Sequence, residues 1–305
     1  MQRYIIIRLL QGILTLLLLS VLVFALTRAT GDPILLLLGT QATEEERESA
    51  REELGLGKPL VTQYFVWAGD VLRGDFGKSI ASRRPVSELL KDRFPATAKL
   101  ALATVIFTVP IGVVLGVLCA LRRNKSVDVL GRTIAVLGQS LPSFWVGIVL
   151  MLLFAVVWEV LPASGIGGPS HYVLPVITMG WFFLAGGIRL TRSSMLEVLG
   201  SDYITFLRAK GTPESSVILK HALRNAAIPI ITLSTVLFAY LLTGSVIAET
   251  VFAWPGLGRL AYQSIFTRDF PVVQAIVMLY GVIFIALNLL ADILYAWTDP
   301  RIRCR

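Results

Sequence analysis

Residues 201–229, SDYITFLRAKGTPESSVILKHALRNAAIP, form a polar and basic stretch between two long apolar runs. Ser201 is a favoured N-cap residue with an acidic residue after it, and Gly211 suits the C-terminus of the helix that follows. Thr212 and Pro213 then supply a second N-cap and a first helical residue. The pattern therefore predicts two short helices joined by a tight turn at Gly211.

The second of these helices is expected to be amphipathic. Its apolar face is predicted to contain Ser215, Ile218, Leu219, Ala222, Leu223 and Ala226. Its polar face is predicted to contain Glu214, Lys220, His221, Arg224 and Asn225. A rigid insert with one face against the apolar runs would offer its other face to a soluble partner. The alternative is an interfacial helix that rests on lipid headgroups, because Lys and Arg suit that role too.

The rest of the chain is apolar enough for a membrane protein. Of its 305 residues 55% are hydrophobic and 16% charged, and its mean hydropathy is +0.73. A helix needs about 20 apolar residues to cross a hydrocarbon core of roughly 30 Å. Six runs qualify: Leu9–Ala29, Ala98–Leu121, Thr133–Val157, Tyr172–Leu190, Ile228–Thr250 and Val272–Trp297. The first is too long for a signal-peptide core, so we expect it to be a retained anchor.

The net charge of +8 orients the protein in the membrane and does not indicate a nucleic-acid groove. Lys and Arg concentrate near the N-terminus, around 122–132, over 189–224 and in the tail, whereas the loop Trp158–His171 has none. This bias predicts that both termini are cytoplasmic. Cys119 falls in an apolar run and Cys304 in the tail, so neither a disulfide nor a metal site is indicated.

The chain is expected to consist of four parts. Residues 1–30 form the first membrane helix and 31–95 an extracytoplasmic cap. Residues 96–297 form a five-helix core that contains the insert at 191–227, and 298–305 a tail. Within the cap, Thr43–Leu54 and Leu60–Leu72 are helix-prone, and the aromatic residues of the second segment indicate a folded element.

Several motifs resemble one family, the ABC-importer permeases of the dipeptide, oligopeptide and nickel class. The insert contributes Tyr203, the run RAKG at 208–211 and the run HALRNA at 221–226, which closes on Pro229. The motifs outside the insert are GDP at 31–33, GDFGKS at 74–79, VFAWPGLG at 251–258 and DPRIR at 299–303. The general importer loop often has Ala and Pro where this chain has Leu207 and Arg224, and Arg224 fits the peptide subgroup.

The resemblance implies an all-α integral membrane protein with six transmembrane helices, in the type I importer fold, within the bacterial inner membrane. It implies half of a heterodimeric pathway, with a second permease subunit, two ATP-binding subunits and an extracytoplasmic binding protein as partners. ATP and Mg would be bound by those subunits, and this chain would hold no cofactor and catalyse nothing. The implied coupling residues are Asp202, Tyr203, Arg208, Ala209, Lys210, Gly211, Thr212 and Glu214.

The sequence has no G-x-x-x-x-G-K-[ST] motif and hence no phosphate cradle of that type. Its nearest approach is Gly77-Lys78-Ser79, where Leu72 replaces the first glycine. Polar residues in or near the spans are candidates for the translocation pathway, and we select Gln139, Ser140 and Glu249. Arg189, Asn288 and Asp292 are further polar residues near the spans. Glu249, Arg189 and Asp292 lie near predicted span ends, where snorkelling or inter-helix pairing is the preferred explanation.

Alternatives remain open at this point. A di- or oligopeptide is the expected solute, with a nickel complex or glutathione as the other solutes that the family takes. A secondary transporter independent of ATP would show inverted repeats or a relay of buried charges, and neither stands out here. A membrane scaffold that docks a partner without transport is the third class.

Overall fold

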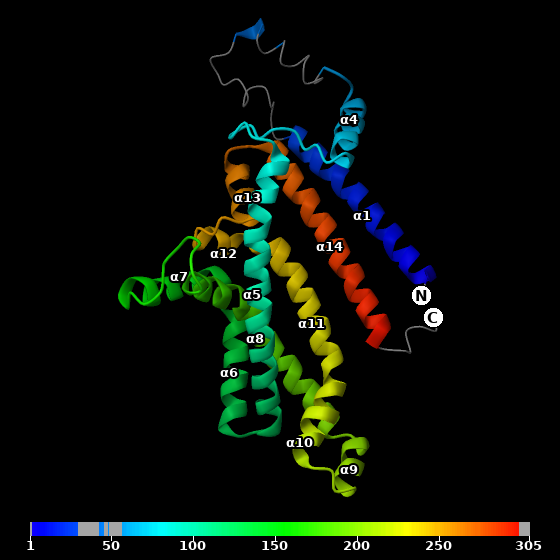
Figure 1. The fold of residues 1–305 in the computed structure, drawn as a ribbon, viewed down its shortest axis with the longest axis vertical. Coiled ribbons are helices and arrows are strands. Elements are labelled where there is room, and N and C mark those ends of the chain that lie inside the picture. Colours follow the sequence, from blue (N-terminus) through cyan, green and yellow to red (C-terminus); the bar gives the residue numbers. More distant parts are fainter. Residues whose placement is uncertain (1, 30–42, 46–47, 49–56, 299–305) are drawn as a thin grey trace. The chain divides into compact units, whose positions relative to one another are not determined.

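The computed structural model describes residues 2–29, 43–45, 48 and 57–298, and its regular elements are helices (Figure 1). The motif at 31–33, most of the segment predicted to be a helix at Thr43–Leu54, and the tail at 299–305 lie outside the described residues. Contacts between residues divide the chain into two compact units, which are described separately. One comprises 2–97 and 255–286, and the other comprises mainly 98–254.

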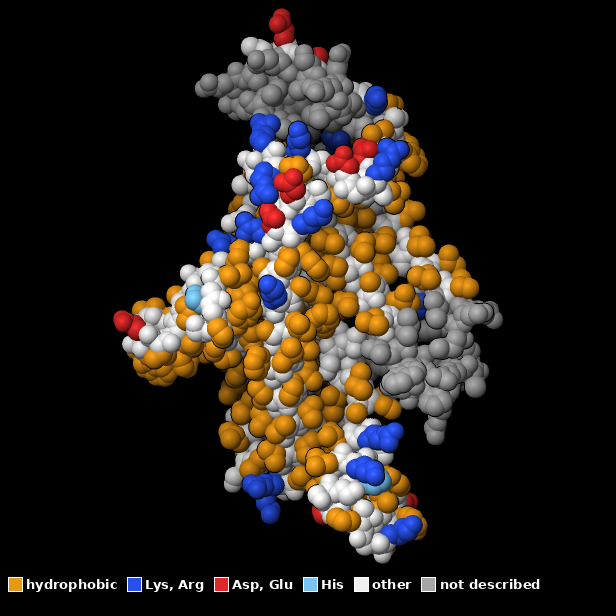
Figure 2. Space-filling view, viewed as in Figure 1, with side chains coloured by type: hydrophobic (Ala, Val, Ile, Leu, Met, Phe, Trp, Pro, Cys, Tyr) orange, Lys and Arg blue, Asp and Glu red, His pale blue; other side chains and the backbone are white. Residues whose placement is uncertain are grey.

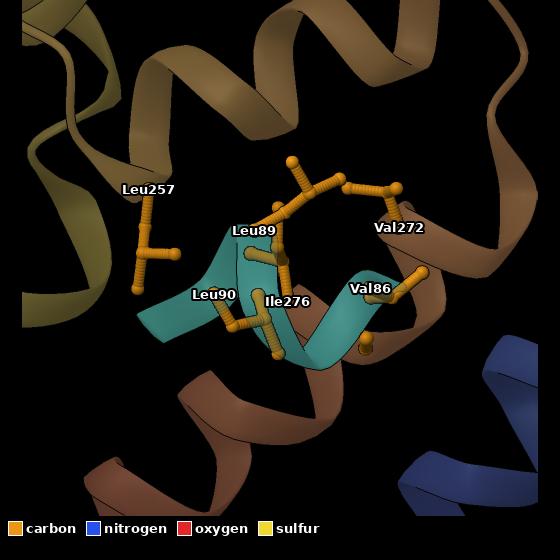
Figure 3. Packing of buried hydrophobic residues seen from close by; sticks show 7 residues of the cluster. Val86, Leu89, Leu90, Leu257, Val272 and Ile276 are labelled. Atoms are coloured by element: carbon orange, nitrogen blue, oxygen red, sulfur yellow. The ribbon is translucent and has the colours of Figure 1, made fainter. Parts of the chain in front are cut away.

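The first unit contains α1 (Gln2–Ala29), α4 (Leu60–Leu72), α13 (Leu257–Phe266), and parts of α5 (Val86–Leu121) and α14 (Phe270–Thr298). Apolar side chains from α5, α13 and α14 form its core: Val86, Leu89, Leu90, Leu257, Val272, Ala275 and Ile276 (Figure 3). The predicted helix at Leu60–Leu72 is confirmed, and it packs against α1 through aromatic rings of Phe24, Tyr64 and Trp67.

One buried carboxylate organises the loop that precedes α5. Asp269 is 2% exposed, and it accepts hydrogen bonds from Ser79 Oγ at 2.5 Å and from the backbone N–H groups of Ile80 and Ala81. An antiparallel bridge between Lys78 and Pro85 closes the same loop. Ser79, the residue that a phosphate-binding motif would direct towards Mg²⁺, therefore fixes this loop to Asp269.

We expect Asp269→Ala to destabilise this loop, because it leaves three donors without their acceptor. Each buried donor left unsatisfied costs roughly 1–3 kcal/mol. The apparent melting temperature in detergent should fall, and proteolysis near residues 79–85 should accelerate. Asp75→Ala removes an exposed acceptor for Gly77 N–H and is the matched control. Equal stability of the two variants would contradict the role given to Asp269.

The second unit is built around α8 (Ser170–Leu199). It packs against α6 (Ser126–Ser140), α7 (Ser143–Met151) and α11 (Leu223–Gly244). Small residues bring α6 close to α8, since a Cβ added at Gly138 would meet Ala185 Cβ at 2.5 Å. Close backbone approach through small residues is how helices associate in a bilayer, where lipid tails are as apolar as the side chains.

The third apolar run does not form one straight helix. It is divided into α6, α7 and the π-helix η1 (Leu152–Val157), and the two halves meet at an angle of 105° around Pro142. At 1.5 Å per residue, α6 spans about 22 Å, which is less than a hydrocarbon core of roughly 30 Å. The apolar run Thr133–Val157 is therefore a broken span that begins inside α6 and ends with η1. Non-helical backbone at this depth is tolerated where it lines a cavity or is buried in protein.

The remaining long helices carry lipid-compatible surfaces. Five described helices are long and apolar enough to cross a membrane, and the bent pair makes six if it counts as one span. Hydrophobic side chains cover much of the face seen in Figure 2, and Lys and Arg gather where α5 and α6 are joined (Figure 2). The all-α membrane fold expected from the sequence is confirmed.

Candidate functional site

The polar insert folds as two helical segments with a sharp turn between them. Helix α9 (Asp202–Ala209) follows α8 after a break at Gly200, and α10 (Glu214–Ser216) follows the turn. Gly211 adopts φ +77°, a left-handed conformation that glycine takes without steric cost. Its N–H donates to Arg208 O, and Thr212 N–H donates to Leu207 O. The predicted helix–glycine–helix arrangement is therefore confirmed.

The insert has its own hydrophobic core, continuous with the membrane helices. Ile204 of α9 and Val217 and Ala222 of the second segment are fully buried, and they pack with Met195 of α8. The apolar face expected from periodicity is wrong at Ser215, which is exposed, and at Leu219, which is 64% exposed, whereas Val217 takes the buried position. The reason is the π-helical turn η2 (Val217–Ala222), which changes the register with which side chains face the core.

Two side-chain contacts connect the segments on either side of the turn. Arg208 Nη2 donates to Glu214 Oε1 at 2.7 Å, and its Nε donates to Glu214 Oε2 at 3.2 Å. Tyr203 Oη and His221 Nδ1 lie 2.7 Å apart in a second hydrogen bond. The Glu214 carboxylate raises the pKa of Arg208, which is charged at any physiological pH. The expected side-chain caps do not form, since Ser201 Oγ donates back to Val198 O and the helix after the turn has Pro213, and not Thr212, at its N-cap.

The insert also presents an exposed surface. Phe206 is 61% exposed, and Lys210 Nζ lies 5.4 Å from the centre of its ring. The predicted coupling residues are brought together around the turn. Seven of them are exposed, namely Asp202, Tyr203, Arg208, Ala209, Lys210, Gly211 and Glu214, while Thr212 is half-buried. Phe206 and Leu219 were absent from that set, although their apolar side chains add to the same exposed surface.

A buried ion pair near the insert was missed by the sequence reasoning. Asp128 of α6 is fully buried, and Arg192 of α8 donates to it through Nε at 2.5 Å and Nη2 at 2.9 Å. The Asn124 N–H donates to the same carboxylate at 2.9 Å. A signal was available, since Asp128 is the one acidic residue in the basic stretch 122–132. The pair ties the start of α6 to the part of α8 that leads into α9.

Removal of one partner of the Asp128–Arg192 pair should lower the stability of the folded protein, because it leaves the other charge partly buried and unpaired. We expect Asp128→Ala to lower stability by roughly 3 kcal/mol. The measurement is the melting temperature of purified protein in detergent. Asp128→Ala combined with Arg192→Met should recover much of the loss, since the pair is then replaced by apolar groups. A double variant no more stable than Asp128→Ala would contradict this account.

The predicted pathway residues lie at or beside one cavity of the second unit. Gln139 and Ser140, at the end of α6, line a cavity of about 610 Å³ together with residues of α8 and α11. Glu249 does not line it. Its side chain is fully buried, and its Oε1 accepts a hydrogen bond from Ser245 Oγ at 2.6 Å, while Ser245 itself lines the cavity. Arg189 is exposed on α8, and the side chain of Asp292 lies outside the described part of the chain.

A bundle of apolar helices, a cavity at a broken span and a rigid polar insert define a membrane permease. The chain belongs to the family described as the binding-protein-dependent transport system inner membrane component, whose model matches residues 112–303. The N-terminal model of the same transport-system components matches residues 1–101. The resemblance to ABC-importer permeases is thereby confirmed, and the chain is a multi-pass protein of the bacterial inner membrane.

Two curated relatives match along nearly the whole chain. The glutathione transport system permease protein GsiC of Salmonella typhimurium (strain LT2) is 44% identical over 304 residues, which is 99% of each chain. The protein of the same name from Escherichia coli (strain K12) is 43% identical over 304 residues, again with 99% coverage of each.

A solved structure shares the fold. A chain of the MetNI methionine ABC transporter, in inward-facing conformations, superposes with a TM-score of 0.58 at 19% sequence identity. The match covers 69% of this chain and 96% of that one. The type I importer fold expected for this protein is thereby confirmed.

Proposed function

We propose that this chain is one of two permease subunits that form the pathway of a heterodimeric, ATP-driven importer. Its insert docks onto a separate ATP-hydrolysing subunit, and this chain hydrolyses nothing itself. Two such subunits and an extracytoplasmic binding protein complete the assembly. The observation that carries this proposal is the insert itself, which combines an exposed apolar and basic surface with internal bonds that keep it rigid.

Coupling requires that movement of the insert reaches the pathway. Met195, at the insert end of α8, is fully buried in the insert's core, and Thr178 and Phe182 of the same helix line the cavity. The Asp128–Arg192 pair fixes α6 to α8 between these two sites. ATP-driven displacement of the insert would therefore move α6 and α8, which both line the cavity. The ATP-hydrolysing subunit would then contact the two states differently, as a two-state change requires.

The basic loops support an orientation with the insert in the cytoplasm. Arg122, Arg123 and Lys125 lie in the turn between α5 and α6, and the insert adds Arg208, Lys210 and Lys220. The loop between η1 and α8 has no Lys or Arg. This distribution follows the positive-inside bias, which supports an orientation with both termini in the cytoplasm.

We infer that the solute is a short peptide. The family resemblance indicates di- and oligopeptides, and the two relatives named as glutathione transport permeases make that tripeptide the first candidate. A nickel complex is the alternative solute, and an ATP-independent secondary transporter is the alternative of a different class. Dependence of uptake on the ATP-hydrolysing subunit separates the importer from the secondary transporter.

We expect Gly211→Val to abolish docking, because a β-branched residue is strained at φ +77° and the turn must change shape. Co-purification of the ATP-hydrolysing subunit and uptake should both be lost, while the amount of inserted permease stays the same. Gly74→Val is the matched control, since Gly74 has φ +80° and an equally open surrounding but lies in the other unit. Retained co-purification in Gly211→Val would overturn the docking role.

The substrate assignment is tested by uptake into cells that express the whole importer. Labelled glutathione should enter in an ATP-dependent way, and excess unlabelled short peptide should compete with it. Uptake of nickel, together with glutathione uptake that excess unlabelled peptide does not reduce, would support the nickel complex as the solute. Uptake that persists without the ATP-hydrolysing subunit would contradict the importer itself.

A further inference from the structure

The cavity beside the broken span has the dimensions of a small-molecule site. Its volume of about 610 Å³ lies within the range of roughly 300–1,000 Å³ that is usual for such sites. Its wall comes from the break between α6 and α7, the middle of α8, and the segment from α11 to α12 (Val246–Val251). Phe182, Tyr240 and Ile247 on this wall are about half exposed, so the cavity opens to the side of the unit.

Several hydrogen-bonding groups of this wall have no partner. Within the described residues, the side chains of Gln139, Ser143 and Tyr240 make no hydrogen bond. Thr178 is 1% exposed, and its Oγ1 is buried without a partner among the described residues. Of these groups Thr178 Oγ1 is buried, and buried polar groups are nearly always hydrogen-bonded, so it needs a partner. Gln139, Ser143 and Tyr240 are partly or largely exposed, which leaves their polar groups open to a molecule in the cavity.

The wall is also electrically neutral. The described residues that line the cavity include no Asp, Glu, Lys, Arg or His. Glu249 lies behind the wall, where its fully buried carboxylate accepts the Ser245 hydroxyl. Aromatic faces of Phe182 and Phe183, with Tyr240, complete the lining. The neutral donors and acceptors of the wall match amide groups, and its aromatic rings match the apolar carbons that lie between amides. The wall offers no counter-charge to an ionised group.

We propose that this cavity is a transit site that recognises the backbone amides of a peptide-sized solute and does not read its charge. The proposal rests on the proposed function, since it assigns the solute-contacting wall of that permease. Gln139 is central to it, because a carboxamide both donates to a peptide carbonyl and accepts from a peptide N–H. Ser143 and Tyr240 supply further hydroxyl contacts, and the aromatic rings pack against the apolar parts.

Neutral contacts also suit passage. Hydrogen bonds between uncharged groups are worth about half of charge-assisted ones, so the solute is held weakly and leaves readily. Binding that is favourable enough for entry and weak enough for exit is the requirement of a conducting pathway. Selection among peptides of different charge would then depend on the binding protein that delivers them.

The test uses the whole importer and three labelled tripeptides of equal length with a central Lys, Ala or Glu. For each peptide, uptake by a variant is divided by uptake by the wild type, which removes the preference of the binding protein. Gln139→Leu should lower uptake of all three peptides by a similar factor, roughly three- to tenfold, because one neutral hydrogen bond is lost. Unchanged uptake, or a loss confined to one charge, would overturn the proposal.

A charge placed in the wall should create the selectivity that the native wall lacks. Gln139→Glu keeps the shape of the side chain and should favour the Lys peptide over the Glu peptide by about fivefold or more. Ser140→Lys should reverse the preference. Thr133→Glu and Thr133→Lys are matched controls, since Thr133 is exposed on the same helix and outside the cavity, and they should leave the ratios unchanged. Equal ratios for wall and control variants would contradict a solute in this cavity.

Co-purification of the ATP-hydrolysing subunit is followed in the same preparations. Loss of peptide uptake with the subunit still bound locates the defect in the cavity. A wild-type chain that binds no such subunit and takes up none of the peptides would overturn the proposed function, and the transit site with it.

Discussion

Continuity of α8 is the constraint on which the second unit depends. A helix of 30 residues is about 45 Å long, and within lipid it cannot open because each backbone group must be satisfied inside the segment. One end of this helix carries Met195 into the core of the insert, and its middle carries Thr178 and Phe182 to the cavity. Packing of α6, α7 and α11 against α8 therefore determines the positions of both the insert and the cavity.

Local sequence signals were sufficient for much of the fold. Apolar runs of the right length predicted the membrane helices, since the bilayer imposes one length on all of them. Gly211 between capping residues predicted the turn of the insert, because few residues adopt its positive φ. The coupling residues follow from the family resemblance of the same contiguous stretch. Their contact with a partner stays a prediction.

Features that depend on distant contacts were not accessible from the sequence. Hydropathy does not register direction, so Pro142 marks an interruption of the apolar run but does not predict the angle of 105°. Asp128 and Arg192 lie 64 residues apart, and no pattern links them. The pathway residues Gln139 and Ser140 were chosen for polarity alone, whereas their shared cavity is a consequence of the bend. Leu219 was assigned to the buried face because a regular helical period was assumed.

The π-helical turn η2 already accommodates one residue more than a regular helix over nearly the same rotation. A further residue inserted there, with no such turn to absorb it, would rotate one side of the segment against the other by about 100°. Val217 and Ile204 would then no longer meet beneath Met195. Chains that keep this packing should therefore vary in side chains along the segment more readily than they gain residues in it.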